Sequence, residues 1–341
     1  MSNIRSNDKQ LAEMFKALGN PHRLLIFQRL SRCCQPGTRC DLEQAISFSV
    51  GQLGEGMQIA PSTLSHHLKA LHYAGLIEME RQGKEVRKAY AEVAVASNSN
   101  GCCGVESSCC GVSDDTAINT LISTRLGYSR DDLAKVPSGA DMGLGCGNPK
   151  AIAALQPGEV VVDLGSGGGF DCFLAAAEVG DTGHVIGVDM TPDMLSKARN
   201  NALRGKYKNV EFRLGEIEAL PIADGCADVI ISNCVINLSP DKDRVFREAF
   251  RILKPGGRLA ISDVVATVEI PQEMRNDPQL VSGCMGNASL VEELEDIMDA
   301  AGFTDIKIEP KDESREFIRD WAPGRGIEEY VVSATIEAAR P

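Results

Sequence analysis

The first third of the chain places apolar residues three or four positions apart, a spacing typical of helices. It predicts helices over residues 11–18, 21–30 and 61–74. The second is expected to be mostly buried, with Asn20 as its N-cap and Pro21 as its first residue. In the third, Leu64, Leu68 and Leu71 share one face. Residues 76–80 and 85–91 flank a polar turn and predict a β-hairpin, so residues 1–95 are expected to form a winged helix-turn-helix domain.

The rest of the chain alternates short β-branched runs with amphipathic segments. Strands are predicted at residues 160–164, 184–189, 210–214, 228–232 and 258–263, and helices near 170–179, 193–204, 241–253 and 291–301. This alternation predicts an α/β fold, a Rossmann-like doubly wound sheet. Residues 306–308 and 331–336 are expected to add an antiparallel edge strand. The predicted domain covers residues 116–341, its last part from about 270 capping the substrate site, and a Cys-rich flexible linker at 96–115 precedes it.

Charge separates the two predicted domains. The chain has a net charge of −13, but residues 1–95 hold 12 Lys+Arg against 9 Asp+Glu. Only this first third is suited to approach nucleic acid. The N-terminus lacks an apolar signal core and no apolar run reaches the ~18 residues of a membrane helix, so a cytoplasmic protein that does not contact membranes is expected.

The third helix and the hairpin carry polar and basic residues that would face DNA: Ser62, Thr63, Ser65, His66, Lys69, Arg81 and Lys84, with Arg87 and Lys88 beside them. Residues 15–24 and 62–77 resemble the ArsR–SmtB repressors, winged-helix proteins that leave DNA on binding a soft metal or metalloid. That resemblance implies operator DNA and a homodimer as partners. The family's Cys-x-Cys sensor pair is replaced by Ser49 and Gly51. A substitute sensor site at Cys33, Cys34 and Cys40 competes with the interpretation of these as incidental loop cysteines.

A glycine loop follows the first strand of the second domain, in Asp163-Leu-Gly-Ser-Gly-Gly-Gly169. Such a loop holds either a dinucleotide or S-adenosylmethionine, and the early acid suits a cationic amino group better than a pyrophosphate. With the turn Lys254-Pro-Gly-Gly257, residues 150–270 resemble class I methyltransferases. The expected S-adenosylmethionine-binding residues are Asp163, Gly165, Ser166, Gly167, Gly169, Asp189, Met190, Glu216, Ile217 and Asn233.

Three cysteines surround that loop in the sequence. Cys146 precedes the first strand, Cys234 follows the fourth, and Cys284 lies beyond the fifth. We expect them to converge at the edge where open sheets bind ligands. Three thiolates suit As(III), which is thiophilic, and its lone pair can attack a sulfonium methyl group. Catalysis would then depend on alignment rather than on acid–base chemistry.

The segments around these cysteines, including Ser232-Asn-Cys-Val-Ile-Asn-Leu238 and Ser282-Gly-Cys-Met-Gly286, resemble arsenite methyltransferases over residues 112–341. The resemblance implies that the three cysteines hold the metalloid, that an upstream cysteine relays disulfides, and that a thiol reductant of the thioredoxin or glutathione type is consumed. Relay candidates are Cys102, Cys103, Cys109 and Cys110; Cys172 and Cys226 are expected to be packing residues.

The sequence therefore predicts an arsenite methyltransferase fused to an arsenic-responsive regulator. Two alternatives remain open at this point. The chain could be a metalloid sensor whose methyltransferase fold only binds, or a methyltransferase for another soft or organic substrate. The number of methyl groups added and the operator are not specified by the sequence.

Overall fold

The computed structural model of the chain describes residues 14, 16, 18–30, 67, 68, 70, 71, 86, 87, 90–94 and 115–341. The chain divides into two compact units, Met1–Arg81 and Gln82–Pro341. The second unit thus begins inside the predicted first domain, residues 1–95. A helical segment at Val86, Arg87 and Tyr90–Ala94 belongs to the second unit.

A seven-stranded sheet forms the centre of the second unit, in the order β3-β2-β1-β4-β5-β7-β6. Its strands are β1 (Val160–Leu164), β2 (His184–Asp189), β3 (Val210–Leu214), β4 (Ala227–Asn233), β5 (Leu253–Ala266), β6 (Thr304–Lys311) and β7 (Val331–Ala339). The first five run parallel, and β7 pairs antiparallel with both β5 and β6. The predicted doubly wound sheet with an antiparallel edge is confirmed.

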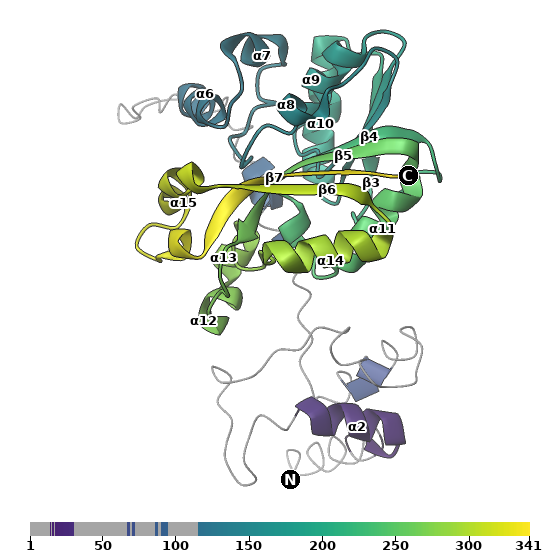
Figure 1. Cartoon of the computed structure of the whole chain (residues 1–341), viewed down its shortest axis with the longest axis vertical. Helices are drawn as coiled ribbons and strands as arrows, with labels where there is room; N and C mark the ends of the chain where they lie inside the picture. The colour runs from purple at the N-terminus through teal and green to yellow at the C-terminus, as the bar shows by residue number, and fades with distance from the viewer. Residues whose placement is uncertain are drawn as a thin grey trace, which may run out of the picture. The chain divides into compact units, whose positions relative to one another are not determined.

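Helices cover both faces of this sheet (Figure 1). One face carries α8 (Lys150–Ala153), α9 (Phe170–Val179) and α10 (Pro192–Gly205), and the other α11 (Lys242–Ile252) and α14 (Val291–Ala301). Because β1 is covered on both sides, its apolar residues alternate between two cores: Val161 packs with α9, and Val162 packs with α11. The sheet therefore presents its ligand-binding chemistry only at the ends of its strands.

The remaining elements of this unit are mostly short helices. They are α6 (Asp115–Arg125), α7 (Arg130–Lys135), η3 (Ile236–Leu238), α12 (Gln272–Arg275), α13 (Pro278–Ser282), η4 (Asp312–Ser314), α15 (Arg315–Trp321) and η5 (Ile327–Glu329). A third apolar cluster forms here and contains all three candidate cysteines; Trp321 packs at its margin against Phe317. The helices in the described part of the chain lack the combined length and apolar character that a membrane span requires.

In the first unit, α2 (Pro21–Leu30) begins as predicted. The Asn20 side chain accepts hydrogen bonds from the backbone of His22 at 3.0 Å and Arg23 at 3.2 Å, which makes it the N-cap. Within this unit Ile26 is fully buried, but Leu24 and Leu25 are 40% and 45% exposed. The expectation that α2 is mostly buried was therefore wrong.

The predicted helix at residues 61–74 is described at four positions, all helical, with Leu68 and Leu71 buried as expected. The prediction that residues 85–91 form the second strand of a hairpin was wrong, because Val86, Arg87 and Tyr90–Ala94 are helical. Arg87 pairs with Glu216 of the methyltransferase unit at 2.8 Å, which occupies a side chain expected to meet DNA phosphate. Alternation of polar and apolar residues over so short a segment does not separate strand from helix.

Candidate functional site

The glycine loop connects β1 to α9 in a conformation that only glycine adopts easily. Gly165, Gly167 and Gly169 have φ angles of 71°, 49° and 91°. A Cβ on Gly165 would lie 2.3 Å from the Val235 side chain, so the loop runs hard against the segment after β4. Around Gly167 nothing would meet an added Cβ within 4 Å. The loop is therefore tightly packed at its start and open at Gly167.

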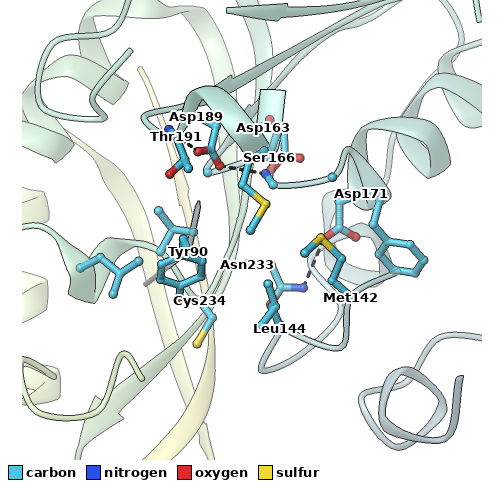
Figure 2. Close-up of a pocket in the computed structure, with 18 of the residues that line it drawn as sticks. Tyr90, Met142, Leu144, Asp163, Ser166, Asp171, Asp189, Thr191, Asn233 and Cys234 are labelled. Atoms are coloured by element: carbon cyan, nitrogen blue, oxygen red, sulfur yellow. Dashed lines mark hydrogen bonds between the residues drawn. The ribbon is translucent and has the colours of Figure 1, made fainter. Parts of the chain in front are cut away.

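Asp189, the last residue of β2, holds this loop in place. Its carboxylate accepts hydrogen bonds from the backbone N–H groups of Gly167 at 2.9 Å and Thr191 at 2.8 Å. Burial raises the pKa of Asp189. Figure 2 shows this carboxylate close to Ser166 and Asp163, which places three polar side chains from two strand ends together.

Two buried carboxylates, one before and one after the loop in the sequence, have different hydrogen-bond donors. Asp171 accepts a hydrogen bond from the Tyr128 hydroxyl at 2.6 Å, and Asp163 accepts one from the Cys172 thiol at 3.1 Å. Burial raises the pKa of Asp171 to about 6, and burial together with the neighbouring Asp171 raises the pKa of Asp163 well above its usual range. Cys172 is fully buried, as expected for a packing residue, and in addition hydrogen-bonds the acid of the loop.

The loop and these acids line a hollow at the strand ends. Eight of the ten expected cofactor residues line it: Asp163, Gly165, Ser166, Gly167, Asp189, Met190, Ile217 and Asn233. The other two do not, since Gly169 packs against Phe173 and Phe212 and the Glu216 side chain is 61% exposed. The buried Ser166 hydroxyl has no hydrogen-bond partner in the described structure. A mostly apolar hollow with buried acids and an unpaired hydroxyl fits S-adenosylmethionine, which offers hydroxyls and two cationic centres.

Three elements bring the candidate cysteines together beside this hollow. Cys146 comes from the loop before α8, Cys234 follows β4, and Cys284 follows α13; their exposed fractions are 1%, 5% and 2%. The Cys284 thiol donates a hydrogen bond to the Cys234 carbonyl at 2.7 Å. The Cys146 and Cys234 sulfur atoms and a carboxylate oxygen of Asp263 lie within 4.8 Å of one another. Because the Cys234 thiol also hydrogen-bonds with the thiols of Cys146 and Cys284, the three thiols form one group, with Asp263 as a close neighbour.

The backbone at two of these cysteines is unusual. Cys234 and Cys284 have φ angles of 59° and 63°, in the left-handed region that side chains other than glycine seldom occupy. Residues held there cost of order 1–3 kcal/mol and cluster at functional sites. The surrounding hydrogen bonds, including the 2.8 Å bond from the Cys234 N–H to the Ser262 carbonyl, maintain this conformation.

The thiols are held in the neutral form. Burial raises the pKa of Cys146. Hydrogen bonds within the group, followed by burial, raise the pKa values of Cys234 and Cys284 well above the usual range. Burial also raises the pKa of Asp263 to about 6, so this carboxyl group is ionised at neutral pH. The site combines three neutral thiols with one buried anion.

Asn233 joins the hollow to the thiol group. Its Oδ1 accepts a hydrogen bond from the Cys146 N–H at 2.9 Å. Its Nδ2 donates to Tyr128 at 3.0 Å, Gly147 at 2.9 Å and Asp171 at 3.2 Å. A Cβ on Gly145 would lie 2.6 Å from this amide, which explains the glycine at that position. Figure 2 shows the Asn233–Asp171 contact next to Cys234.

Sequence reasoning missed Tyr90, Tyr128, Asp171 and Asp263 as members of the site. Tyr90 lies on the helix that had been predicted as a strand; its hydroxyl donates to the Ser282 carbonyl at 3.3 Å and hydrogen-bonds Cys284. Asp263 could have been found, because it lies near the carboxyl end of a predicted central strand. Asp171 directly follows the glycine loop. Nothing in the local sequence marks Tyr90 or Tyr128.

Many predicted residues lie outside the described part of the chain. They are the candidate sensor cysteines Cys33, Cys34 and Cys40, the relay candidates Cys102, Cys103, Cys109 and Cys110, and the DNA-facing side chains of Ser62, Thr63, Ser65, His66, Lys69, Arg81 and Lys84.

Comparison with known proteins agrees with the two-part organisation. Residues 155–302 match the family described as "Methyltransferase domain", and residues 47–79 match "Bacterial regulatory protein, arsR family". An arsenite methyltransferase of Halobacterium salinarum is 55% identical over 77% of this chain and 67% of its own length. The human arsenite methyltransferase is 41% identical, over 42% of this chain and 40% of its own length.

A solved structure, an arsenic(III) S-adenosylmethionine methyltransferase from Chlamydomonas reinhardtii, is 34% identical over 64% of this chain and 72% of that chain, with a TM-score of 0.48. The identity to the Halobacterium protein, over two thirds of its length, shows the family. The chain belongs to the arsenite methyltransferase family and carries an arsR-type regulatory segment ahead of its methyltransferase domain.

Proposed function

We propose that this protein methylates As(III) with S-adenosylmethionine and that Cys146, Cys234 and Cys284 hold the arsenic during transfer. Three buried thiols beside an acid-lined hollow are the observation that carries the proposal. Family membership supports it, since several relatives are named arsenite methyltransferase.

The neutral state of the thiols favours arsenic over a divalent cation. A cation such as Zn²⁺ needs thiolates, so its binding must release protons. Arsenous acid, As(OH)₃, instead exchanges each hydroxyl group for a thiol sulfur and releases water that contains the thiol proton. Three neutral thiols give a neutral As(SR)₃ centre without any change in net charge. The raised pKa values of Cys146, Cys234 and Cys284 therefore suit this substrate.

The hollow would hold the methyl donor through residues of four strand ends. Bound S-adenosylmethionine supplies an electrophilic methyl group on a sulfonium. Asp163 and Asp171 are buried carboxyl groups whose ionised form its cationic groups would favour, and Ser166 offers an unpaired hydroxyl. Asp189 is placed to accept from ribose hydroxyls. Catalysis then consists mainly of holding the arsenic lone pair in line with the methyl carbon.

Methylation leaves arsenic oxidised by two electrons, which must be returned before another cycle. Two thiols that release arsenic as a disulfide supply those electrons. One of the upstream cysteines, Cys102, Cys103, Cys109 or Cys110, would receive the disulfide by exchange, and an external thiol reductant of the thioredoxin or glutathione type would reduce it.

Incubation of the purified full-length chain with arsenite, S-adenosylmethionine and a thiol reductant, followed by arsenic speciation, tests this proposal. The wild type should form methylated arsenicals, and Cys234→Ser should form none while still binding S-adenosylmethionine. Cys226→Ser is the matched control, because Cys226 is a free thiol packed outside the thiol group, and it should retain activity. Absence of methylated products from the wild type, or their formation by Cys234→Ser, would contradict the proposal.

The arsR-type segment favours a second activity, namely binding of operator DNA as a homodimer in the cytoplasm, with release by As(III). Cys33, Cys34 and Cys40 are the proposed sensor thiols. A gel-shift assay on the DNA upstream of the coding sequence, with and without arsenite, tests this activity. Equal mobility of the DNA in the presence and absence of protein would contradict it.

A further inference from the structure

Methyl transfer moves a positive charge to the thiol group, and the neutral thiols carry no negative charge to stabilise it. In the proposed reaction the arsenic lone pair forms the As–C bond, the C–S bond breaks, and its electron pair stays on sulfur. The donor changes from a sulfonium cation to a neutral thioether, while neutral As(SR)₃ becomes a methylarsenic cation. One positive charge therefore moves from the cofactor hollow to the thiol group. An anion near arsenic would stabilise this movement more in the transition state than in the ground state.

Asp263 is the carboxylate that the structure places at that position. It lies near the end of β5, is 2% exposed, and has an oxygen within 4.8 Å of the Cys146 and Cys234 sulfur atoms. No Lys, Arg or His of the described residues forms an ion pair with it within 4.0 Å. The buried Lys242 acts on it electrostatically, but the Lys242 ammonium donates hydrogen bonds to the Asn287 carbonyl and the Ser289 hydroxyl instead.

The Asp263 carboxylate is fixed in orientation by three hydrogen-bond donors. It accepts from the backbone N–H groups of Ile236 at 2.8 Å and Val264 at 2.7 Å, and from the Asn237 side chain at 2.9 Å. These neutral donors orient the group without cancelling its charge. A buried charge in this setting acts over a few ångströms with little screening.

We propose that Asp263 is a catalytic residue that stabilises the positive charge delivered to arsenic by methyl transfer. This inference rests on the proposed function. It assigns Asp263 a role in the rate of transfer, whereas binding of As(III) depends on the thiols and binding of the methyl donor depends on the hollow.

Single-turnover methyl transfer by Asp263→Asn tests the proposal, with As(III) and the methyl donor preloaded. We expect the transfer rate to fall about 100-fold, which is within the range found when one stabilising group is removed from a transition state. The affinities for As(III) and for S-adenosylhomocysteine should change less than threefold. A transfer rate within twofold of the wild type would overturn the proposal. Failure of the wild type to methylate would instead contradict the proposed function.

Asp263→Asn removes a charge and also alters hydrogen bonds to residues 236 and 237. The ratio of two ligand affinities distinguishes the electrostatic effect from the structural one. Sinefungin carries an ammonium group where the donor has its methylsulfonium, and S-adenosylhomocysteine is neutral there. The ratio of their affinities, measured by calorimetry, therefore reports the negative potential at the transfer site. We expect Asp263→Asn to reduce the preference for sinefungin about fivefold.

Asn237→Ala is the matched control, because it breaks a hydrogen bond to Asp263 at 2.9 Å while keeping the charge. It should retain the sinefungin preference and lose much less of the transfer rate than Asp263→Asn. If Asn237→Ala loses the rate as strongly as Asp263→Asn, or if Asp263→Asn leaves the binding ratio unchanged, Asp263 is a structural anchor and the proposal is overturned. Loss of As(III) affinity in Asp263→Asn would make it a ligand and overturn the proposal as well.

Discussion

Replacement of Asn233 by alanine should affect stability and methyl transfer together, because one amide connects the two halves of the site. The change removes four hydrogen bonds, to Cys146, Gly147, Tyr128 and Asp171. It leaves the buried Cys146 N–H without this partner, at a cost of about 1–3 kcal/mol. It also removes a donor to the Asp171 carboxyl group, and bonds to charged groups contribute roughly 1.5–3 kcal/mol.

The free energy of unfolding of the methyltransferase unit should therefore fall by about 3 kcal/mol, allowing for relaxation and for water that enters the site. The Cys146 loop would lose its link to the cofactor hollow, and a shift of about 1 Å in a reacting group lowers the rate by roughly 100-fold. Urea unfolding followed by far-ultraviolet circular dichroism measures the first effect. Steady-state methylation of arsenite measures the second, as a fall of about 100-fold in kcat/KM for arsenite.

Asn209→Ala is the matched control for this prediction. The Asn209 amide donates to two backbone carbonyls, Ala176 at 3.1 Å and Gly180 at 3.0 Å, at the end of α9 and away from the thiols. It should lose stability but keep kcat/KM for arsenite. The reasoning would be refuted if Asn233→Ala and Asn209→Ala had the same kcat/KM for arsenite within about threefold, or if Asn233→Ala unfolded at the wild-type urea concentration.

Three further substitutions test other contacts of the site. Gly145→Ala places a Cβ 2.6 Å from the Asn233 amide; methylation assays should show at least about tenfold lower kcat/KM for arsenite, and wild-type kinetics would contradict this. Tyr90→Phe removes the hydroxyl whose hydrogen bond lowers the pKa of Cys284, so pH-dependent alkylation should show a higher Cys284 pKa, with unchanged affinity for S-adenosylhomocysteine. Burial raises the folded-state pKa of Asp171 to about 6, so the native state binds the extra proton between about pH 4 and pH 6, and this group's contribution to stability is lost as pH rises through that window. Asp171→Asn should remove up to about 3 kcal/mol of that pH dependence, measured as the change in unfolding free energy from pH 4.5 to pH 7; an unaltered pH dependence would count against the burial argument.

Sheet and helix positions were predictable from the sequence because local periodicity determines them. Residues 160–162 are apolar on both faces and begin β1, and the predicted helices at 170–179 and 291–301 match α9 and α14. The positions of Cys146, Cys234 and Cys284 near strand ends were also predictable, since parallel strands end at one edge of a sheet. The glycines of the loop after β1 likewise allowed the position of the cofactor hollow to be predicted.

The remaining site residues depend on contacts between segments far apart in the sequence. Tyr90 lies 192 residues from Ser282, whose carbonyl accepts its hydroxyl hydrogen bond. Asn233 was predicted from its strand-end position to bind the cofactor, but its role at Cys146 depends on a loop 87 residues away. The neutral state of the thiols depends on hydrogen bonds within the thiol group and on burial, which the sequence pattern does not reveal. For α2 the sequence pattern predicted burial that the structure does not show, because the apolar Leu24 and Leu25 are exposed within their unit.

The central claim is that arsenic binds three sulfur atoms in front of the cofactor hollow, although the tightest group around Cys146 and Cys234 includes an oxygen of Asp263. Arsenic K-edge X-ray absorption tests it most directly, on a chain in which the other upstream cysteines, Cys33, Cys34, Cys40, Cys102, Cys103, Cys109 and Cys110, are replaced by serine. With one equivalent of As(III), we predict three sulfur neighbours, falling to two sulfurs and one oxygen in the additional Cys284→Ser variant. Two sulfurs and one oxygen already in the parent, or three sulfurs that persist without Cys284, would contradict the account.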